Sequence, residues 1–325
     1  MSFFLGVDVG GTKTHALIAN DQGEALGFSE AGSGNHQSVG YNGLGDVLKM
    51  TVEQALRQAR LSVDEIAGAG FGIGGYDWPS QFQAHWDAIA PLGLLCPVEL
   101  SNDSIIGLMA GAPRAWGLVL IAGTGNNCRG RDRNGREARI TGEGGRFGEY
   151  GGAGEMVEKA IQAISHQWTR RGPKTALSKM FIRMTGAKDL DALIEGIDLD
   201  CYHPDASWAP AIFQAARAGD RVAHEIIDWS GRESGESACA VIRQLKIEDE
   251  QFDVILVGSV FVGGQLYIRP LRQTIHKLAP RAKLVKLSAP PVVGGVILGM
   301  KKGGLPTPPI YRKLIDSTKK LIGER

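Results

Sequence analysis

The feature that most constrains the fold of this chain is a glycine-rich turn between two strand-like segments, which occurs twice. The first turn, Gly10-Gly11-Thr12-Lys13, follows the apolar segment 3–9 and precedes the alternating, β-branched segment 14–19. Rossmann and P-loop sites require a helix after the glycine turn, and the chain has no G-x-x-x-x-G-K-[ST] motif. Both of these common nucleotide motifs are therefore excluded.

A turn that joins two strands can still hold phosphate. Gly10 and Gly11 carry no side chains, so backbone N–H groups and the Thr12 hydroxyl can approach phosphate oxygens closely. Asp8 lies just before the turn, and its carboxylate would repel phosphates unless a divalent cation lay between them, which indicates Mg²⁺ bound at Asp8. The competing interpretation is an ordinary hairpin with a convenient glycine pair.

The second turn, Gly123-Thr124-Gly125, lies between the strand-like segments 117–122 and 127–131. Two equivalent turns indicate two α/β domains of similar opening topology, which could hold a polyphosphate from both sides of a central cleft. We expect the first domain to comprise residues 1–113 plus 305–325 and the second to comprise residues 114–304.

Hydrophobic periodicity predicts the remaining elements. The further strands expected are 25–29, 66–72, 97–100, 137–141, 252–257 and 282–287. The helices expected are 41–59, 82–89, 104–110, 151–168, 175–184, 190–197, 208–218, 221–245, 265–278, 292–300 and 310–322.

Composition indicates a small-molecule partner. The chain has 325 residues, of which 43% are hydrophobic, and a formal net charge of +1, so neither nucleic acid nor an anionic membrane is an expected partner. The amino-terminal residues lack a signal-peptide pattern, and no apolar run approaches the roughly 18 residues of a membrane span. Four widely separated cysteines favour a reducing compartment. We therefore expect a cytoplasmic protein.

Asp103 is the first candidate for catalysis. It lies between an expected strand and an expected helix, where free N–H groups and the helix dipole favour an ionised carboxylate. One interpretation is a helix N-cap. The other is a carboxylate that orients an acceptor hydroxyl and accepts its proton during phosphoryl transfer, a reaction in which positioning matters more than base strength.

Several motifs together resemble the sugar kinases of the actin, Hsp70 and hexokinase superfamily, and most closely the N-acetylglucosamine kinase branch of the BadF/BadG/BcrA/BcrD-type ATPases. The resemblance spans nearly the whole chain and implies two ribonuclease H-like (actin-like ATPase) domains of the βββαβα type that flank a central cleft. It rests on the order and spacing of Asp8–Thr14, Ser33–His36, Ser101–Asp103, Ala122–Arg129, Gly142–Gly145, Gly148–Gly151 and Val257–Val260.

The resemblance also implies roles for residues, with ATP and Mg²⁺ as cofactors and a homodimer as the assembly. The implied ATP-binding positions are Gly10, Gly11, Thr12, Lys13, Gly123, Thr124, Gly125, Gly258 and Ser259. The implied sugar-binding positions are Asn35, Asn102, Asp103, Gly142, Glu143, Gly144 and Glu149, with Asp103 as the catalytic residue. What the Lys13 side chain does is left open. His15 and His36 have no carboxylate or cysteine neighbours at metal-ligand spacing in the sequence.

The implied reaction transfers the γ-phosphoryl group of Mg·ATP to the 6-hydroxyl of an amino sugar, with N-acetylglucosamine as the first expectation. Gly148-Glu149-Tyr150-Gly151 departs from the Gly-Asp-Glu-Gly run that is common in this branch, so glucosamine and glucose stay open as substrates. Two other classes of protein are alternatives to a sugar kinase. The separated cysteines disfavour an ATPase that activates an iron–sulfur dehydratase. A first strand at about residue 3 leaves no room for the DNA-binding module of a non-catalytic sugar sensor.

Overall fold

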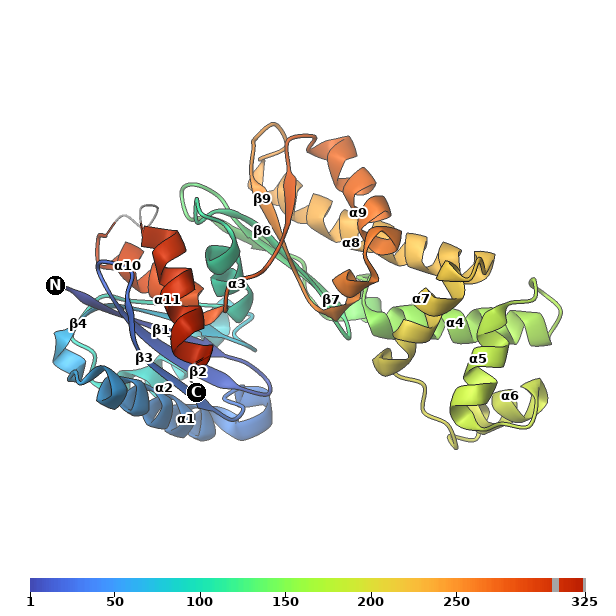
Figure 1. Cartoon of the computed structure of the whole chain (residues 1–325), viewed down its shortest axis with the longest axis horizontal. Helices are drawn as coiled ribbons and strands as arrows, with labels where there is room; N and C mark the ends of the chain where they lie inside the picture. Colours follow the sequence, from blue (N-terminus) through green and yellow to red (C-terminus); the bar gives the residue numbers. More distant parts are fainter. Residues whose placement is uncertain (306–309, 324–325) are drawn as a thin grey trace. The chain divides into compact units, whose positions relative to one another are not determined.

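The computed structural model describes residues 1–305 and 310–323 and divides into two compact units (Figure 1). The first unit comprises Met1–Val119, Arg133–Gly135 and Val285–Arg325. The second unit comprises Leu120–Asp132 and Arg136–Leu284. No described helix is both long enough and apolar enough to span a membrane.

The first unit is built on a five-stranded sheet of order β3-β2-β1-β4-β5. The β1–β2 and β2–β3 pairs are antiparallel, and the β1–β4 and β4–β5 pairs are parallel. The strands are β1 (Phe3–Val9), β2 (Thr14–Asn20), β3 (Ala25–Ala31), β4 (Ile66–Ile73) and β5 (Val98–Ser101). The helices are α1 (His36–Ala59), α2 (Phe82–Ile89), α3 (Asp103–Gly111), α10 (Val292–Lys302) and α11 (Tyr311–Gly323), with short 3₁₀ turns at Val63–Glu65, Pro79–Gln81 and Ala90–Leu92.

The second unit contains a five-stranded sheet of order β8-β7-β6-β9-β10, which repeats the order of the first sheet. The strands are β6 (Gly117–Ala122), β7 (Asn126–Arg131), β8 (Glu137–Arg139), β9 (Asp253–Val257) and β10 (Lys283–Lys286). The helices are α4 (Ala153–Trp168), α5 (Ala176–Thr185), α6 (Leu190–Asp198), α7 (Ala209–Arg217), α8 (Arg221–Leu245) and α9 (Gln265–Leu278), with 3₁₀ turns at Gly144–Phe147, Ala206–Trp208 and Ser259–Gly263. The repeated strand order confirms the predicted α/β fold with two similar topologies.

Most predicted elements are present, and apart from the start of α1 their ends shift by at most two residues. Helix α1 begins at His36 rather than at residue 41, because Asn35 caps it and Gly40 then interrupts it with a φ of 70°. Strand β8 ends at Arg139, two residues before the predicted end. Residues 285–304 group with the first unit, since α10 packs on β1 and β4. Residues 306–309 and 324–325 of the expected first domain lie outside the described residues.

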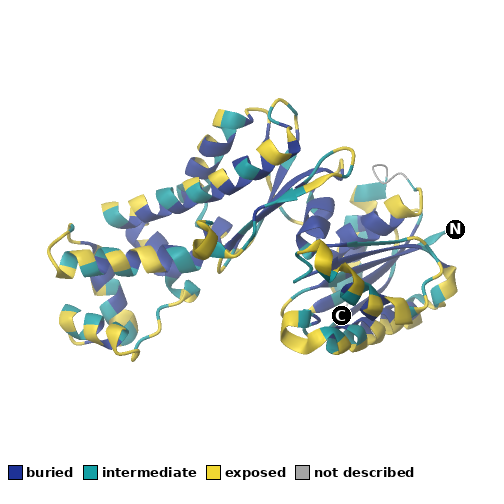
Figure 2. Cartoon of the chain, turned by 180° about the vertical axis from the view of Figure 1, so that it is seen from behind, coloured by how far each residue is buried: buried dark blue, intermediate teal, exposed yellow. Residues whose placement is uncertain are grey.

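The first sheet is buried between two layers of helices, and Figure 2 shows its strands in the colour of buried residues while the outer helix faces are exposed. On one face, Leu5, Val7 and Val9 of β1 pack with the apolar stripe of α1. On the other face, Phe4 of β1 packs with α3, α10 and α11. Side chains alternate along a strand, so Asp8 follows Phe4 and Gly6 on the face of α3 and α10.

Glycines let α10 lie directly on the backbone of the first sheet. A Cβ on Gly6 of β1 would lie 2.2 Å from Val296 N, and a Cβ on Gly70 of β4 would lie 2.3 Å from Gly295 O. A Cβ on Gly294 would lie 1.8 Å from Ile106 O of α3. Only a hydrogen atom fits in place of a side chain at Gly6, Gly70 and Gly294. These close contacts fix the positions of β1, β4 and α3 around α10.

We predict that Gly294→Ala destabilises the protein. Alanine would gain about 1 kcal/mol of helix propensity over glycine. Overpacking costs roughly 1–3 kcal/mol or more, and here the obstacle is a backbone carbonyl rather than a flexible side chain. The urea midpoint of unfolding should therefore fall. Gly32→Ala is the control, because a Cβ on Gly32 would meet no atom within 4 Å. An unchanged midpoint for Gly294→Ala would contradict the close packing.

Candidate active site

The ends of the parallel strands bring three chain segments together in the first unit. Parallel strands end at the same edge of a sheet, and Asp8 lies near the end of β1 while Gly74 directly follows β4. Gly74 N donates to Val9 O over 2.8 Å. A Cβ on Gly74 would lie 3.0 Å from Asp103 Oδ2 and 3.0 Å from Val9 O. The Asp103 carboxylate therefore lies against the ends of β1 and β4.

Asn102, and not Asp103, caps helix α3. The Asn102 side-chain oxygen accepts from Ser104 N over 3.0 Å, and Asp103 is the first residue of the helix. The Asn102 amide NH₂ donates to Tyr76 O at 3.1 Å and to Asp77 Oδ1 at 3.3 Å. The N-cap interpretation of Asp103 is therefore wrong. Because both ends of the Asn102 amide are engaged inside the first unit, its side chain supports the site rather than facing a ligand.

Asn35 lies beside this edge at the start of α1. Its side-chain oxygen accepts from Gln37 N over 2.9 Å, and a Cβ on Gly75 would lie 2.8 Å from the same oxygen. Gly75 has a φ of 86°, so the turn after β4 requires glycine there both for its conformation and for the space. The predicted sugar-binding residue Asn35 is thus next to the turn that contacts Asp103.

Two histidines form the aromatic wall next to Asn35. The His36 ring stacks on Tyr41 at 4.6 Å and meets His85 edge-on at 4.8 Å between ring centroids. His85 is fully buried, and its Nδ1 lies 2.8 Å from Gln81 O. Burial lowers the pKa of both His36 and His85. Burial therefore favours the neutral form of both imidazoles.

The first glycine turn is short and open. Gly10 N donates to Lys13 O over 2.9 Å, and Gly11, Thr12 and Lys13 are exposed. A Cβ on Gly11 would meet no atom within 4 Å. Packing within the described chain does not explain this glycine.

The sheet register gives Lys13 and His15 partners that their sequence spacing did not show. Lys13 Nζ lies 2.8 Å from Glu30 Oε1 in an exposed ion pair, so the ammonium of this predicted ATP-binding residue already has a carboxylate partner. His15 Nε2 lies 2.9 Å from Glu30 Oε2, and His15 Nδ1 lies 3.9 Å from Asp8 Oδ2. The nearby Asp8 carboxylate is the largest influence that raises the pKa of His15, and Glu30 adds to it.

The second glycine turn rests on the start of α4. Gly123 N donates to Gly125 O over 3.0 Å, which closes the turn. Ala153 N then donates to Gly123 O, and Gly154 N donates to Thr124 O, each over 2.8 Å. The first N–H groups of α4 thereby bind the turn's carbonyls and leave Thr124 and Gly125 exposed.

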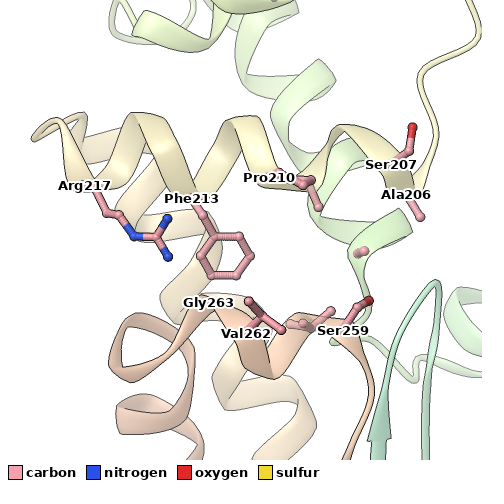
Figure 3. A pocket seen from close by; sticks show the side chains of 11 residues that line it. Ala206, Ser207, Pro210, Phe213, Arg217, Ser259, Val262 and Gly263 are labelled. Carbon is pink, nitrogen blue, oxygen red and sulfur yellow. The ribbon is translucent and has the colours of Figure 1, made fainter.

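A pocket of about 270 Å³ opens next to this turn in the second unit (Figure 3). Gly258 has a φ of 118°, and a Cβ there would lie 2.2 Å from Ala122 O at the end of β6. Ser259 and Val262 form one side of the pocket, and Phe213 and Arg217 of α7 form the other (Figure 3). Gly258 and Ser259 were predicted from the sequence as ATP-binding positions. Phe213 and Arg217 were not predicted, because their helix shows only an ordinary amphipathic pattern.

The predicted sugar loop of the second unit contains an unexpected arrangement. Both carboxylate oxygens of Glu149 accept hydrogen bonds from residues 141–143. A Cβ on Gly142 would lie 2.8 Å from Asn127 Nδ2, and Asn127 Oδ1 is buried with no hydrogen-bond partner among the described residues. Asn127 occurs in the second glycine motif, but only the structure shows its unsatisfied acceptor beside the loop.

A half-buried carboxylate lies beside both loops of the second unit. Glu155 Oε2 accepts from Gly152 N over 2.8 Å at the start of α4, and burial raises the pKa of Glu155. A Cβ on Gly144 would lie 3.5 Å, and one on Gly125 4.0 Å, from Glu155 Oε1. In the part of the chain that the structure describes, no three His, Cys, Asp or Glu side chains are grouped to hold a metal ion by themselves.

We predict that Asn102 stabilises the first unit through both ends of its amide. Asn102→Ala should lower the free energy of unfolding by roughly 1–3 kcal/mol, because it removes the cap of α3 and the hydrogen bonds that the Asn102 amide donates to Tyr76 and Asp77. Asn102→Asp keeps the cap acceptor but places a second carboxylate beside Asp77. The double variant Asn102→Asp/Asp77→Asn should recover part of the loss in urea unfolding, because an amide again faces a carboxylate. Wild-type stability of Asn102→Ala would contradict this role.

Two relatives match most of this chain. The N-acetylmuramic acid/N-acetylglucosamine kinase of Clostridium acetobutylicum is 27% identical over 300 residues, which are 92% of this chain and 98% of the relative. The N-acetyl-D-glucosamine kinase of Dictyostelium discoideum is 22% identical over 311 residues, which cover 91% of this chain and 97% of the relative.

A solved structure and a family pattern complete the comparison. The ROK family glucokinase from Streptomyces griseus, in complex with glucose and AMPPNP, has a TM-score of 0.52 at 17% identity over 92% of this chain and 100% of that chain, which supports the fold. The pattern of the BadF/BadG/BcrA/BcrD ATPase family matches residues 5–299 and confirms the resemblance seen in the motifs. The chain belongs to the BadF/BadG/BcrA/BcrD ATPase family.

Proposed function

We propose that this protein is an ATP-dependent kinase that transfers the γ-phosphoryl group to a hydroxyl of an amino sugar, with the 6-hydroxyl of N-acetylglucosamine as the preferred acceptor. The observation that carries the proposal is the Asp103 carboxylate at the ends of β1 and β4, at a helix start that another residue caps. The kinases of Clostridium acetobutylicum and Dictyostelium discoideum, both named for N-acetylglucosamine, support the choice of sugar.

Asp103 would act as the general base. Its position in the first turn of α3 favours the ionised carboxylate, which can accept a hydrogen bond from the sugar hydroxyl and then its proton. The transferred phosphoryl group passes through a loose transition state, so holding the hydroxyl in line contributes more than basicity. The His36 ring, which packs on buried His85, would lie against the sugar ring beside Asn35.

The glycine turns would bind ATP. Exposed Thr12 in the first unit and exposed Thr124 in the second each present a hydroxyl and neighbouring N–H groups to phosphate oxygens. The pocket lined by Ser259, Phe213 and Arg217 would take the adenosine, with the base against the Phe213 ring.

Mg²⁺ would be held at Asp8. One half-buried carboxylate next to an open phosphate turn suits a cation that binds through one or two carboxylates and the substrate's phosphates. When bound, the ion neutralises phosphate charge.

Asn127 is the candidate polar contact for the substrate in the second unit. Asn127 Oδ1 is a buried acceptor without a partner among the described residues, and an N–H or O–H of the substrate would satisfy it. Glu143 is exposed on the loop beside it. Glucosamine and glucose stay the alternative acceptors, because Glu149 and Tyr150 depart from the common family run.

The test is ADP release with Mg·ATP across glucose, glucosamine, N-acetylglucosamine and N-acetylmannosamine. We expect N-acetylglucosamine to give the highest kcat/KM. Asp103→Asn should lower kcat by about 100-fold or more while sugar and ATP binding persist, since general base catalysis contributes roughly 10²–10⁴-fold. Asp46→Asn, the same change at an exposed position of α1, should leave kcat unchanged.

Two results would overturn the proposal. If none of these sugars increased ADP release, the protein would not be a hexosamine or hexose kinase. If Asp103→Asn kept near-normal turnover with each bound substrate, the proton would leave the sugar by another route and Asp103 would not be the base.

A further inference from the structure

The carboxylate of Glu149 is engaged inside its own loop. Glu149 Oε1 accepts from Thr141 N over 2.7 Å. Glu149 Oε2 accepts from Thr141 Oγ1 over 2.7 Å, from Gly142 N over 2.7 Å and from Glu143 N over 3.2 Å. Three of these four donors are consecutive backbone N–H groups, so the carboxylate fills a backbone nest.

This geometry leaves little capacity for a sugar. An ionised carboxylate has about four acceptor sites, two on each oxygen; here three donors bind Oε2, and Oε1 accepts one. Hydrogen bonds to an ionised acceptor are roughly twice as strong as neutral ones, so exchanging them for a sugar hydroxyl gives no gain. Most of the acceptor capacity of Glu149 is therefore used by its own loop.

The backbone that follows Glu149 is held by hydrogen bonds from buried side chains. Asn126 Nδ2 donates to Tyr150 O over 3.0 Å, and Tyr267 OH donates to Gly151 O over 2.7 Å. Tyr267 is fully buried, and burial raises its pKa, so the hydroxyl remains a donor. The two residues after Glu149 are thus fixed to the interior of the second unit.

The segment that Glu149 holds lies directly against a substrate-binding candidate. Gly142 has a φ of 80°, and a Cβ on it would lie 2.8 Å from Asn127 Nδ2. Gly144 has a φ of 68° and lies beside Glu155 Oε1. These backbone conformations are open mainly to glycine, which has no side chain to hold the loop in place. The carboxylate of Glu149 supplies that restraint from inside.

We infer that Glu149 is a positioning residue that holds residues 141–143 in the sugar-binding conformation, and that it does not itself contact the sugar. The inference rests on the proposed kinase function and changes the role that the family resemblance implies for this position. It also gives a reason for glutamate. One methylene less would draw the carboxylate back along the loop by about 1.5 Å, so an aspartate could not keep all four bonds.

Hydrogen exchange of the loop tests this inference without any substrate. In the free protein, Glu149→Gln should speed exchange of the amides of residues 141–143 by about 10-fold or more, because a neutral amide replaces a charged acceptor and loses one oxygen. Thr141→Val should speed exchange too, whereas Thr141→Ser, which keeps the hydroxyl, should stay near the wild type. Glu195→Gln on exposed α6 is the matched control and should change nothing.

Kinetics with deoxy sugars separate positioning from direct contact. For Glu149→Gln we expect the KM for the sugar to rise by about 10-fold or more, with the KM for ATP unchanged. The same factor should apply to N-acetylglucosamine and to its 3-deoxy and 4-deoxy analogues. Thr141→Val and Glu149→Gln should be non-additive, since both break the same restraint.

Two outcomes would overturn the inference. Unchanged amide exchange in Glu149→Gln would show that the carboxylate does not hold the loop. A penalty that vanishes for one deoxy sugar would show direct contact with the missing hydroxyl. The exchange result stands even if the protein phosphorylates no sugar, so failure of the restraint and failure of the proposed function are distinguishable. Should Glu149→Gln fail to fold, the Thr141→Val and Thr141→Ser pair decides the exchange experiment.

Discussion

The first unit depends on the contact between helix α10 and the backbone of its sheet. Gly6 and Gly70 let the helix lie on β1 and β4, and Gly294 lets it lie on α3. These are the three elements that carry Asp8, the Gly74 turn and Asp103. A segment from near the end of the chain therefore sets the spacing of groups that come from its first third.

The chemistry follows from where the strands end. A sheet edge where parallel strands finish exposes loop backbone and gathers polar side chains from several strands. Neighbouring side chains surround the two carboxylates at that edge. Asn102 caps α3, so Asp103 lies in the first turn of the helix. His15 lies beside Asp8. In the second unit, the carboxylate of Glu149 accepts hydrogen bonds from the backbone of residues 141–143 and thereby shapes this loop.

Local pattern was enough to predict most of the fold and several members of the site. The two glycine turns, the strands around them and the position of Asp103 after a strand all follow from hydrophobic periodicity and chain order. Partners across a sheet do not, because register decides them: His15 pairs with Asp8 and Glu30 only once β1, β2 and β3 are aligned. The assignment of 285–304 to the second domain failed for a similar reason, since nothing local shows on which sheet a helix packs.

The most direct test of the account is a crystal structure of the protein with N-acetylglucosamine and a non-hydrolysable ATP analogue. The account predicts one sugar hydroxyl within hydrogen-bonding distance of the Asp103 carboxylate, the nucleotide base in the pocket at Phe213, and Glu149 still bonded to residues 141–143. A sugar bound away from Asp103 would contradict the central claim that this strand-end carboxylate activates the acceptor.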